Sequence, residues 1–339
     1  MSELYAWGGP AGRGVIRARP EDFEVEEILG HQPSGDGEHL WLWIEKREQN
    51  TVDVASMLAK AAGLHPREVS FAGLKDRNAI TRQYFSMHLA GQADPDWSRW
   101  TLPGVSLLAA ERSVRKIQRG RLKGNRFVLT VRELDADREQ LERRLVQLRD
   151  HGAPNGFGEQ RFGGNNIARA RALFAGRMRR KPGKHKRGFY LSAARSLLFN
   201  QVLQARIEDA SWNRILDGEV AMLDGSHAFF APEPGDPDIA GRCRRLDLHP
   251  TGPMAGLGDS PVSGSVAKLE QRIFEAEAEL VLGLEQFRLK HERRALRMRV
   301  GELEWAFPEP NCLKLVFTLG SGSYATSVLR ELICHDLPT

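Results

Sequence analysis

One short stretch of the chain places a carboxylate between two cations. In VSFAGLKDRNAITRQYFSM, residues 69–87, Asp76 lies between Lys75 and Arg77. Gly73 frees the backbone for a sharp turn just before a strand-like run, so the turn can project a side chain at the rim of a sheet. The adjacent cations favour the charged form of the aspartate. An ionised carboxylate in a basic groove can act as a nucleophile or as a base toward an anionic ligand.

The same turn also has a purely structural interpretation. An aspartate in a tight turn before a strand commonly caps the turn and pairs with a neighbour. Taken alone, the residues around Asp76 favour this interpretation, so a chemical role needs support from the rest of the chain.

A second candidate lies in LKGNRFVLTV, residues 122–131. In a strand, the side chains of Asn125 and Phe127 point to the same face. An amide beside an aromatic ring can read and stack an unstacked base, with Lys123 and Arg126 close by for the phosphates. A phenylalanine in the core and an asparagine that closes a turn explain the pattern equally well.

Two further aromatic residues are candidates for contacts with a ligand. RARPEDFEVEEI, residues 17–28, alternates like an edge strand, and its Phe23 is either a core residue or a stacking platform. KLVFTLGSGSYATSVLREL, residues 314–332, is similar to a dinucleotide-binding fingerprint. Too few residues follow this segment to complete that fold, so we expect a glycine turn into a short helix with Tyr324 at its start.

Composition excludes several classes of protein. The chain has 339 residues, 41% hydrophobic and 27% charged, which predicts a globular protein with a real core and two domains. No apolar run approaches the ~18 residues of a membrane span, and the start of the chain lacks the pattern of a signal peptide. The three cysteines are far apart, and neither HExxH nor GxSxG occurs. We therefore expect a cytoplasmic protein without a metal centre.

Positive charge is concentrated in three segments, although the net charge is only +5. Residues 112–126 and 177–187 contain seven Lys and Arg each, and residues 288–299 contain six. One such cluster is commonly just a solvated surface. Three of them, with glycine, proline and aromatic residues interleaved, favour binding to a nucleic acid.

Hydrophobic periodicity predicts the elements that position these residues. Apolar residues at helical spacing predict helices at 51–63 (with Thr51 as N-cap), 138–152, 191–210 (opening at Ser192) and 265–287. Aromatic and β-branched runs predict strands at 39–46, 79–87, 125–134 and 312–319. Strands near both ends and helices between them predict a sheet domain with an insertion. We assign residues 1–151 and 299–339 to the sheet domain and 152–298 to the insertion.

Five segments together resemble the D-type tRNA pseudouridine synthase family. They are FAGLKDRNAITRQYF, RLKGNRF, NGFGEQRFGGNN, KRGFYLSAARSLLFNQV and GSGSYATSVLREL. They occur in order along nearly the whole chain, and residues 211–262 are the least similar stretch. The combination is much more specific than any one of its parts.

The resemblance implies a fold and an activity. The fold is α+β: a pseudouridine synthase core with a mixed, mostly antiparallel sheet, plus an inserted family-specific α/β domain. The activity is isomerisation of uridine to pseudouridine in tRNA, at position 13 in the D arm, without a cofactor or metal. The partner is tRNA, with no membrane and no obligate protein partner, and we expect a monomer.

The resemblance also implies roles for single residues. Asp76 corresponds to the catalytic aspartate, and Lys75 and Arg77 would keep it ionised or hold its loop. Asn125 corresponds to a residue that contacts the target base and orients the aspartate. Phe127 lies beside it, where other pseudouridine synthases often have Tyr.

Three more residues are implied to contact the substrate. Phe23 matches a substrate-contacting residue of the family. Tyr324 lies where relatives often have Phe, which keeps the ring and adds a hydroxyl. Arg17 lies where a relative has Lys, which keeps the charge but changes its geometry.

Two other functions are compatible with the residues taken alone. A non-catalytic RNA-binding or RNA-folding protein would use the same basic clusters and aromatic rings, with Asp76 in a structural role. A nucleoside hydrolase would use Asp76 on small substrates, but it would have little use for the clusters. Salt-dependent tRNA binding is expected of both the isomerase and the RNA-binding protein, so only analysis of the product separates them.

Overall fold

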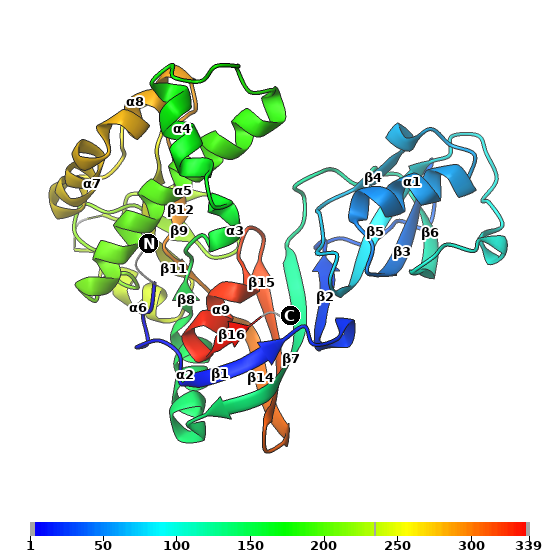
Figure 1. Ribbon diagram of the computed structural model, residues 1–339, viewed down its shortest axis with the longest axis horizontal. Helices are drawn as coiled ribbons and strands as arrows, with labels where there is room; N and C mark the ends of the chain where they lie inside the picture. The colour runs from blue at the N-terminus through cyan, green and yellow to red at the C-terminus, as the bar shows by residue number, and fades with distance from the viewer. Residues whose placement is uncertain (1–3, 234, 337–339) are drawn as a thin grey trace. The chain divides into compact units, whose positions relative to one another are not determined.

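The structure, a computed structural model, describes residues 4–233 and 235–336 (Figure 1). The chain divides into two compact units. The sheet unit consists of Gly12–Asp137, Gly301–Gly322 and the described residues from Cys334 onward. The helical unit consists of the described residues up to Ala11, Arg138–Val300 and Ser323–Ile333.

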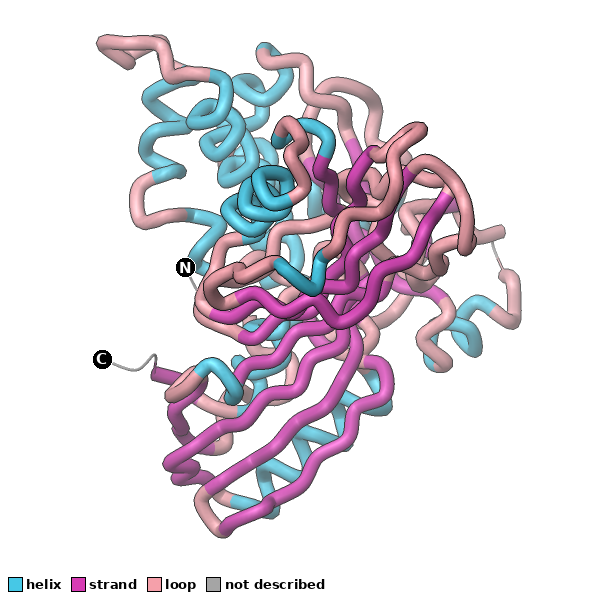
Figure 2. Tube along the Cα trace, turned by 90° about the vertical axis from the view of Figure 1, so that its right-hand side faces the viewer, coloured by secondary structure: helices cyan, strands magenta, loops and turns pink. Residues whose placement is uncertain are grey.

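The sheet unit is built on one ten-stranded sheet, whose long strands are drawn in magenta in Figure 2. Along its main path the order is β14 (Gly301–Glu309), β15 (Cys312–Gly320), β7 (Gly124–Ala136), β2 (Phe23–Ile28), β5 (Ile80–His88), β3 (His39–Arg47) and β6 (Val105–Ser113). Off this path, β1 (Gly12–Ile16) pairs with β7 and β16 (Cys334–Asp336), and β4 (Val69–Phe71) pairs with β5. Among the described strands, β2–β5 and β1–β16 are the parallel pairs and the others are antiparallel. The expected mixed, mostly antiparallel sheet is therefore confirmed.

Two sets of apolar side chains form the core of the sheet unit. Helix α1 (Thr51–Ala61) packs Val54 and Leu58 against buried side chains of β3 and β5, such as Leu42 and Phe85. On β7, every second residue from Phe127 to Val131 is buried, as the two-residue repeat of a strand requires. Phe127 lies opposite both Val25 of β2 and Phe317 of β15, so it joins three strands.

The helical unit carries the remaining α-helices of the described residues. These are α2 (Arg138–His151), α3 (Glu159–Phe162), α4 (Asn166–Phe174), α5 (Lys184–Glu208), α6 (Ile239–Arg244), α7 (Gly264–Ala276), α8 (Ala278–Gln286) and α9 (Ala325–Leu332). Two small sheets complete it, one of β10 (Phe229–Phe230), β9 (Ala221–Leu223), β11 (Leu248–Met254) and β12 (Glu292–Ala295), the other of β13 (Arg297–Met298) and β8 (Ala153–Pro154). Its core gathers around α5, which buries Leu198, Phe199 and Leu203. No helix of the described residues is long and apolar enough to span a membrane.

Most predicted elements are present, with four corrections. The helix expected to open at Ser192 already begins at Lys184. The expected edge strand at Phe23 is a central one, because the polar positions of β2 find partners in the sheet, as Glu24 does with Arg82. The N-cap of α1 is Asn50, and Thr51 is its first residue, because the Thr51 hydroxyl is used elsewhere. The helix expected at 265–287 is interrupted at Glu277.

The limits of the compact units differ from the predicted domain boundaries. The helical unit already begins at Arg138, ends at Val300 and includes short segments from near both ends of the chain. These limits describe packing in space and not evolutionary origin, so the family-specific insertion at 152–298 stays a prediction.

Candidate active site

Asp76 lies in the loop between β4 and β5, and its carboxylate is open to solvent. About 40% of the side chain is exposed, and its Oδ2 accepts a hydrogen bond of 2.5 Å from Nη2 of Arg17. Arg17 directly follows β1 and has a φ of 60°, in the left-handed region that non-glycine residues seldom adopt. A cation that directly follows β1, 59 residues away in the sequence, thus forms the ion pair with this carboxylate.

Arg17 also links Asp76 to an aromatic cluster. Its guanidinium carbon lies 4.1 Å from the centre of the Phe23 ring. Phe23 packs edge to face against Phe127 at 6.4 Å, and Phe127 stacks on Phe317 at 5.3 Å. Phe23 and Phe127 are only 4% and 7% exposed, so both rings belong to the core in this structure. The guanidinium of Arg17 covers one face of the Phe23 ring.

The two cations that flank Asp76 in the sequence have other partners. Lys75 Nζ lies 3.0 Å from Oε1 of Glu27 and donates a hydrogen bond of 2.7 Å to Oδ1 of Asn125. Nε of Arg77 donates to the carbonyl of Glu48 at 3.2 Å. Lys75 thus holds the loop, as expected, whereas the ion pair with Asp76 is made by Arg17. The role of Asn125 toward a target base stays a prediction.

Glu27 is a residue that the sequence analysis missed. It lies opposite Asn125 in the β2–β7 pair, and its side chain is fully buried. Burial raises the pKa of Glu27, while the ammonium of Lys75 opposes this shift. Alternation along β2 could have predicted its burial, because Phe23, Val25 and Glu27 share the apolar face of the strand.

Two buried side chains hold the backbone of the loop before Asp76. Nε2 of Gln83, on β5, donates to the carbonyl of Gly73 at 3.1 Å. The hydroxyl of Thr51, at the start of α1, accepts from the amide of Lys75 at 2.9 Å and donates to Oε1 of Gln83 at 3.1 Å. Both side chains are buried, so these bonds are protected from competition with water.

A third buried side chain holds Asp76 itself. Nζ of Lys46, near the end of β3, donates to the carbonyl of Asp76 at 2.7 Å and to that of Gln49 at 2.8 Å. Burial lowers the pKa of Lys46 from its usual 10.5 to about 8, an effect that the charge of Asp76 opposes. We call Lys46, Thr51 and Gln83 the loop clamp. None of them was predicted to belong to the site.

Tyr324 belongs to the helical unit, whereas the other five predicted site residues belong to the sheet unit. It is the N-cap residue of α9, as expected from the glycine turn before it. Its hydroxyl accepts a hydrogen bond of 2.5 Å from Nη2 of Arg161, and its ring meets that of Phe157 at 6.4 Å. Its role toward the substrate stays a prediction.

The three basic clusters differ in what they leave exposed. Most cations of 112–126 and all those of 177–187 are exposed. In 288–299, however, Arg293 is buried against Glu270, and Arg297 is buried among backbone carbonyls and His249. For Arg293 and Arg297 the predicted nucleic-acid footprint is therefore wrong, because these arginines satisfy buried acceptors inside the helical unit, while three other cations of the cluster are exposed.

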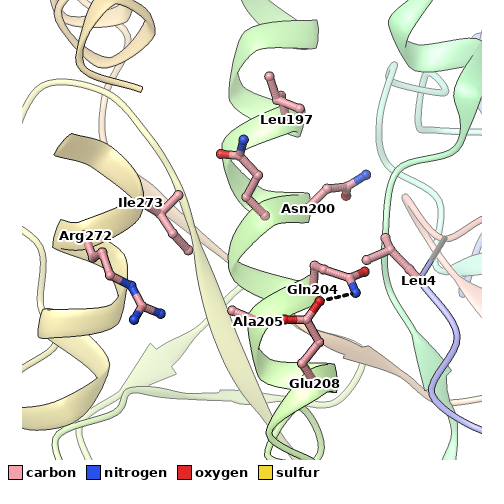
Figure 3. Close-up of a pocket in the computed structure, with 9 residues that line it drawn as sticks. Leu4, Leu197, Asn200, Gln204, Ala205, Glu208, Arg272 and Ile273 are labelled. Atoms are coloured by element: carbon pink, nitrogen blue, oxygen red, sulfur yellow. Dashed lines mark hydrogen bonds between the residues drawn. The ribbon is translucent and has the colours of Figure 1, made fainter. Parts of the chain in front are cut away.

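Two cavities lie outside the predicted site residues. One, of about 330 Å³, lies in the helical unit and is lined by α5, α7 and Leu4. Figure 3 shows this cavity, with the hydrogen bond that joins Gln204 and Glu208 of α5. The other, of about 530 Å³, is a groove in the sheet unit beside α1 and β4. Among residues 4–233 and 235–336, no group of three or more His, Cys, Asp or Glu side chains is arranged to hold a metal ion.

Comparison with known proteins gives consistent results. A family model described as tRNA pseudouridine synthase D (TruD) matches residues 2–179 and 180–332. The tRNA pseudouridine synthase D of Hydrogenovibrio crunogenus is 44% identical over 97% of this chain and 95% of its own length. That of Methylococcus capsulatus is 46% identical over 98% of this chain and 94% of its own length.

A solved structure has the same fold. The crystal structure of the putative tRNA pseudouridine synthase D from Methanosarcina mazei superposes with a TM-score of 0.73. The match covers 98% of this chain and 96% of that one, at 22% sequence identity. It supports the assignment of the fold.

The buried pair of Glu27 and Lys75 can be tested by a double-mutant cycle. Glu27→Gln leaves the Lys75 ammonium buried without a counter-charge, so we expect a loss of about 3–5 kcal/mol in the free energy of unfolding. Adding Lys75→Met should recover at least half of this loss, because no buried charge remains. The measurement is urea unfolding of the three variants and the wild type.

The matched control is Asp135→Asn, which breaks the exposed pair with Arg13, whose side chains are both 74% accessible. We expect it to cost less than about 1 kcal/mol. If Glu27→Gln costs no more than this control, the buried pair is not what holds Lys75 in place.

Lys46 should give stability a specific dependence on pH. Its pKa is about 8 when folded and 10.5 when unfolded, so between these values the unfolded chain keeps a proton that the folded chain has released. This contribution to stability is therefore complete above pH 10.5 and lost as the pH falls through 8. From pH 7.5 to 9.5 the unfolding free energy should rise by about 2 kcal/mol more in the wild type than in Lys46→Met. The measurement is urea unfolding at the two pH values. If the unfolding free energy rises equally in the wild type and in Lys46→Met, the ammonium of Lys46 is not desolvated.

Proposed function

Because the chain belongs to the tRNA pseudouridine synthase D family, it is an isomerase of tRNA uridine, and we propose that it acts at position 13 in the D arm with Asp76 as the reacting group. The observation that carries the assignment of Asp76 is its environment. It is an exposed carboxylate, paired with Arg17, on a loop whose backbone is held by three buried side chains. A reacting group needs this combination of access and fixed position.

The reaction moves one glycosidic bond. The bond between C1′ and N1 of uridine breaks, the base turns, and C5 joins C1′; a proton then leaves C5 and N1 is protonated. An ionised carboxylate serves either as the nucleophile at C1′ or as the base toward the sugar. Both routes begin with the carboxylate of Asp76, whose Oδ2 is paired with Nη2 of Arg17.

The other residues bind and orient the base in this proposal. Extruding a uridine from structured RNA costs a few kcal/mol, and stacking on a planar group returns about 1–3 kcal/mol. The guanidinium of Arg17 lies over the ring of Phe23, and Phe23 in turn packs edge to face against Phe127. Asn125, fixed by Lys75, offers its amide group to the edge of the base. Tyr324 contacts the substrate through its ring.

The proposal extends to the setting of the reaction. We place the protein in the cytoplasm with its tRNA substrate, and as a monomer. The absence of disulfides among its three cysteines, which are all described and free, is compatible with a reducing compartment.

The test of function is conversion of a tRNA transcript by the purified protein, with pseudouridine mapped along the product. We expect one conversion, at position 13, and none in a transcript whose position 13 is cytidine.

Asp76→Asn should abolish conversion, because the amide is neither a nucleophile nor a base, while tRNA binding changes by no more than a few-fold. Asp135→Asn, an exposed aspartate elsewhere in the sheet unit, is the control and should retain full activity. An active Asp76→Asn variant would refute the assignment of the reacting group.

The cluster at 177–187 is proposed to contact phosphates of the tRNA. Replacing Arg179, Arg180 and Lys181 by alanine removes three exposed cations, so the slope of log binding constant against log salt should fall by about two to three. A matched triple variant replaces three exposed cations outside the cluster in the same unit, Arg143, Arg245 and Lys268. Equal slopes for the two variants would mean that only the general charge of the protein matters.

A further inference from the structure

The groove of about 530 Å³ in the sheet unit is separate from the residues assigned to the reaction. We propose that it is a second nucleotide subsite, which binds a nucleotide of the same RNA strand near the target uridine. This inference rests on the proposed function for the identity of the RNA. Nothing in the family match or in the resemblance assigns a role to this groove.

Three segments that are distant in sequence form its walls. Val52, Ala55 and Ser56 come from α1, and residues 66–71 come from the 3₁₀ turn η2 (Pro66–Glu68) and β4. The loop 116–119 between β6 and β7 closes the third side. Helix α1 and β4 lie side by side in the sheet unit (Figure 1), so these walls belong to one packed body.

The charged residues that line the groove are all cations. They are Arg67, Lys116 and Arg119, all exposed, and no acidic residue lines the groove. None of the three forms an ion pair with a described residue, whereas most other arginines of the sheet unit do so, such as Arg82 and Arg132. Three unneutralised cations around one groove attract a ligand with more than one negative charge.

The apolar lining distinguishes this groove from a simple anion site. Val52, Val69, Phe71 and Ile117 supply apolar surface between the cations. The guanidinium of Arg119 lies 4.9 Å from the centre of the Phe71 ring, so the ring supports it from below. Bases of single-stranded RNA stack on guanidinium planes as they do on aromatic rings, while neighbouring phosphates pair with Lys and Arg. The lining therefore fits one base and its flanking phosphates better than an acidic peptide, whose Asp and Glu side chains have no ring to stack on the guanidinium of Arg119.

The groove is connected directly to the loop of Asp76. Phe71 precedes Asp76 by five residues, so their Cα atoms are at most roughly 18 Å apart. The amide of Gly120 donates to the carbonyl of Ala72 at 2.8 Å, which ties the cationic loop to the start of the Asp76 loop. Thr51 of the loop clamp is next to Val52 in the groove wall. A strand with its uridine at Asp76 can therefore reach the groove within a few nucleotides.

The first experiment measures RNA affinity. In the groove variant, Arg67, Lys116 and Arg119 are replaced by alanine; in the control variant, the exposed cations Lys60, Arg99 and Lys314 of the same unit are replaced. Binding to an unmodified tRNA transcript is measured by fluorescence anisotropy at several salt concentrations, and melting curves check the fold. We expect the groove variant to bind at least tenfold more weakly with a salt slope smaller by about two, and the control to lose less than threefold. Equal affinities for the two variants would overturn the proposal.

The second experiment identifies what occupies the groove. A photo-crosslinking benzoylphenylalanine at Gln118, an exposed lining residue, is irradiated in the complex with the same transcript. We expect a crosslink to one nucleotide within a few positions of the converted uridine. A crosslink far from that uridine, or no crosslink while binding is intact, would refute the subsite.

These outcomes are separable from those of the proposed function. If the protein crosslinks tRNA through the groove but forms no pseudouridine, the catalytic proposal fails and the groove still binds RNA. If it converts uridine while the groove variant binds like the control, the groove proposal fails and the catalytic one stands.

Discussion

The position of Asp76 depends on hydrogen bonds that its loop receives from inside the sheet unit. Lys46, Thr51 and Gln83 are each at most 1% exposed, and a buried donor without a partner costs about 1–3 kcal/mol, more when it is charged. The loop carbonyls of Gly73 and Asp76 supply two of the required acceptors. Movement of the loop away from the clamp would cost Lys46 one of its two carbonyl acceptors and Gln83 the acceptor of its Nε2. The core therefore determines the position of the loop. The exposed carboxylate of Asp76 is held in place by side chains that are themselves buried.

The backbone conformation of Arg17 depends on the contacts of its side chain. Its left-handed backbone conformation carries a cost of about 1–2 kcal/mol for a residue with a side chain. Two interactions offset it, the ion pair with Asp76 and the contact with the face of Phe23. Both involve the same guanidinium, and only 14% of the Arg17 side chain is exposed. The guanidinium of Arg17 is therefore fixed from two sides, by the carboxylate of Asp76 and by the buried ring of Phe23.

The sequence predicted the elements of the sheet unit better than the contacts within its site. The strands around Asn125 and Leu315 follow from alternation, a property of neighbouring residues. The partners of Asp76 do not, because Arg17 and Lys46 are 59 and 30 residues away. The burial of Lys46 did have a local signal, because in β3 it shares the face of the buried Leu42 and Ile44. Glu27 had the same kind of signal, since its phase in β2 places it with Phe23 and Val25.

The same limit applies to charge. The clusters at 177–187 and 288–299 have a similar density of Lys and Arg in the sequence. The cations of the first are exposed, whereas the second contains Arg293 and Arg297, which are buried. Burial of an arginine requires acceptors from elsewhere in the chain, here Glu270 and the carbonyls of Cys243 and Leu248. Only the structure identifies these acceptors, and it separates the cations that stabilise the fold from those that can bind a polyanion. Cations without an ion pair to a described residue, such as Lys116 and Arg119, stay available to phosphate, and they lie on the wall that adjoins the Asp76 loop.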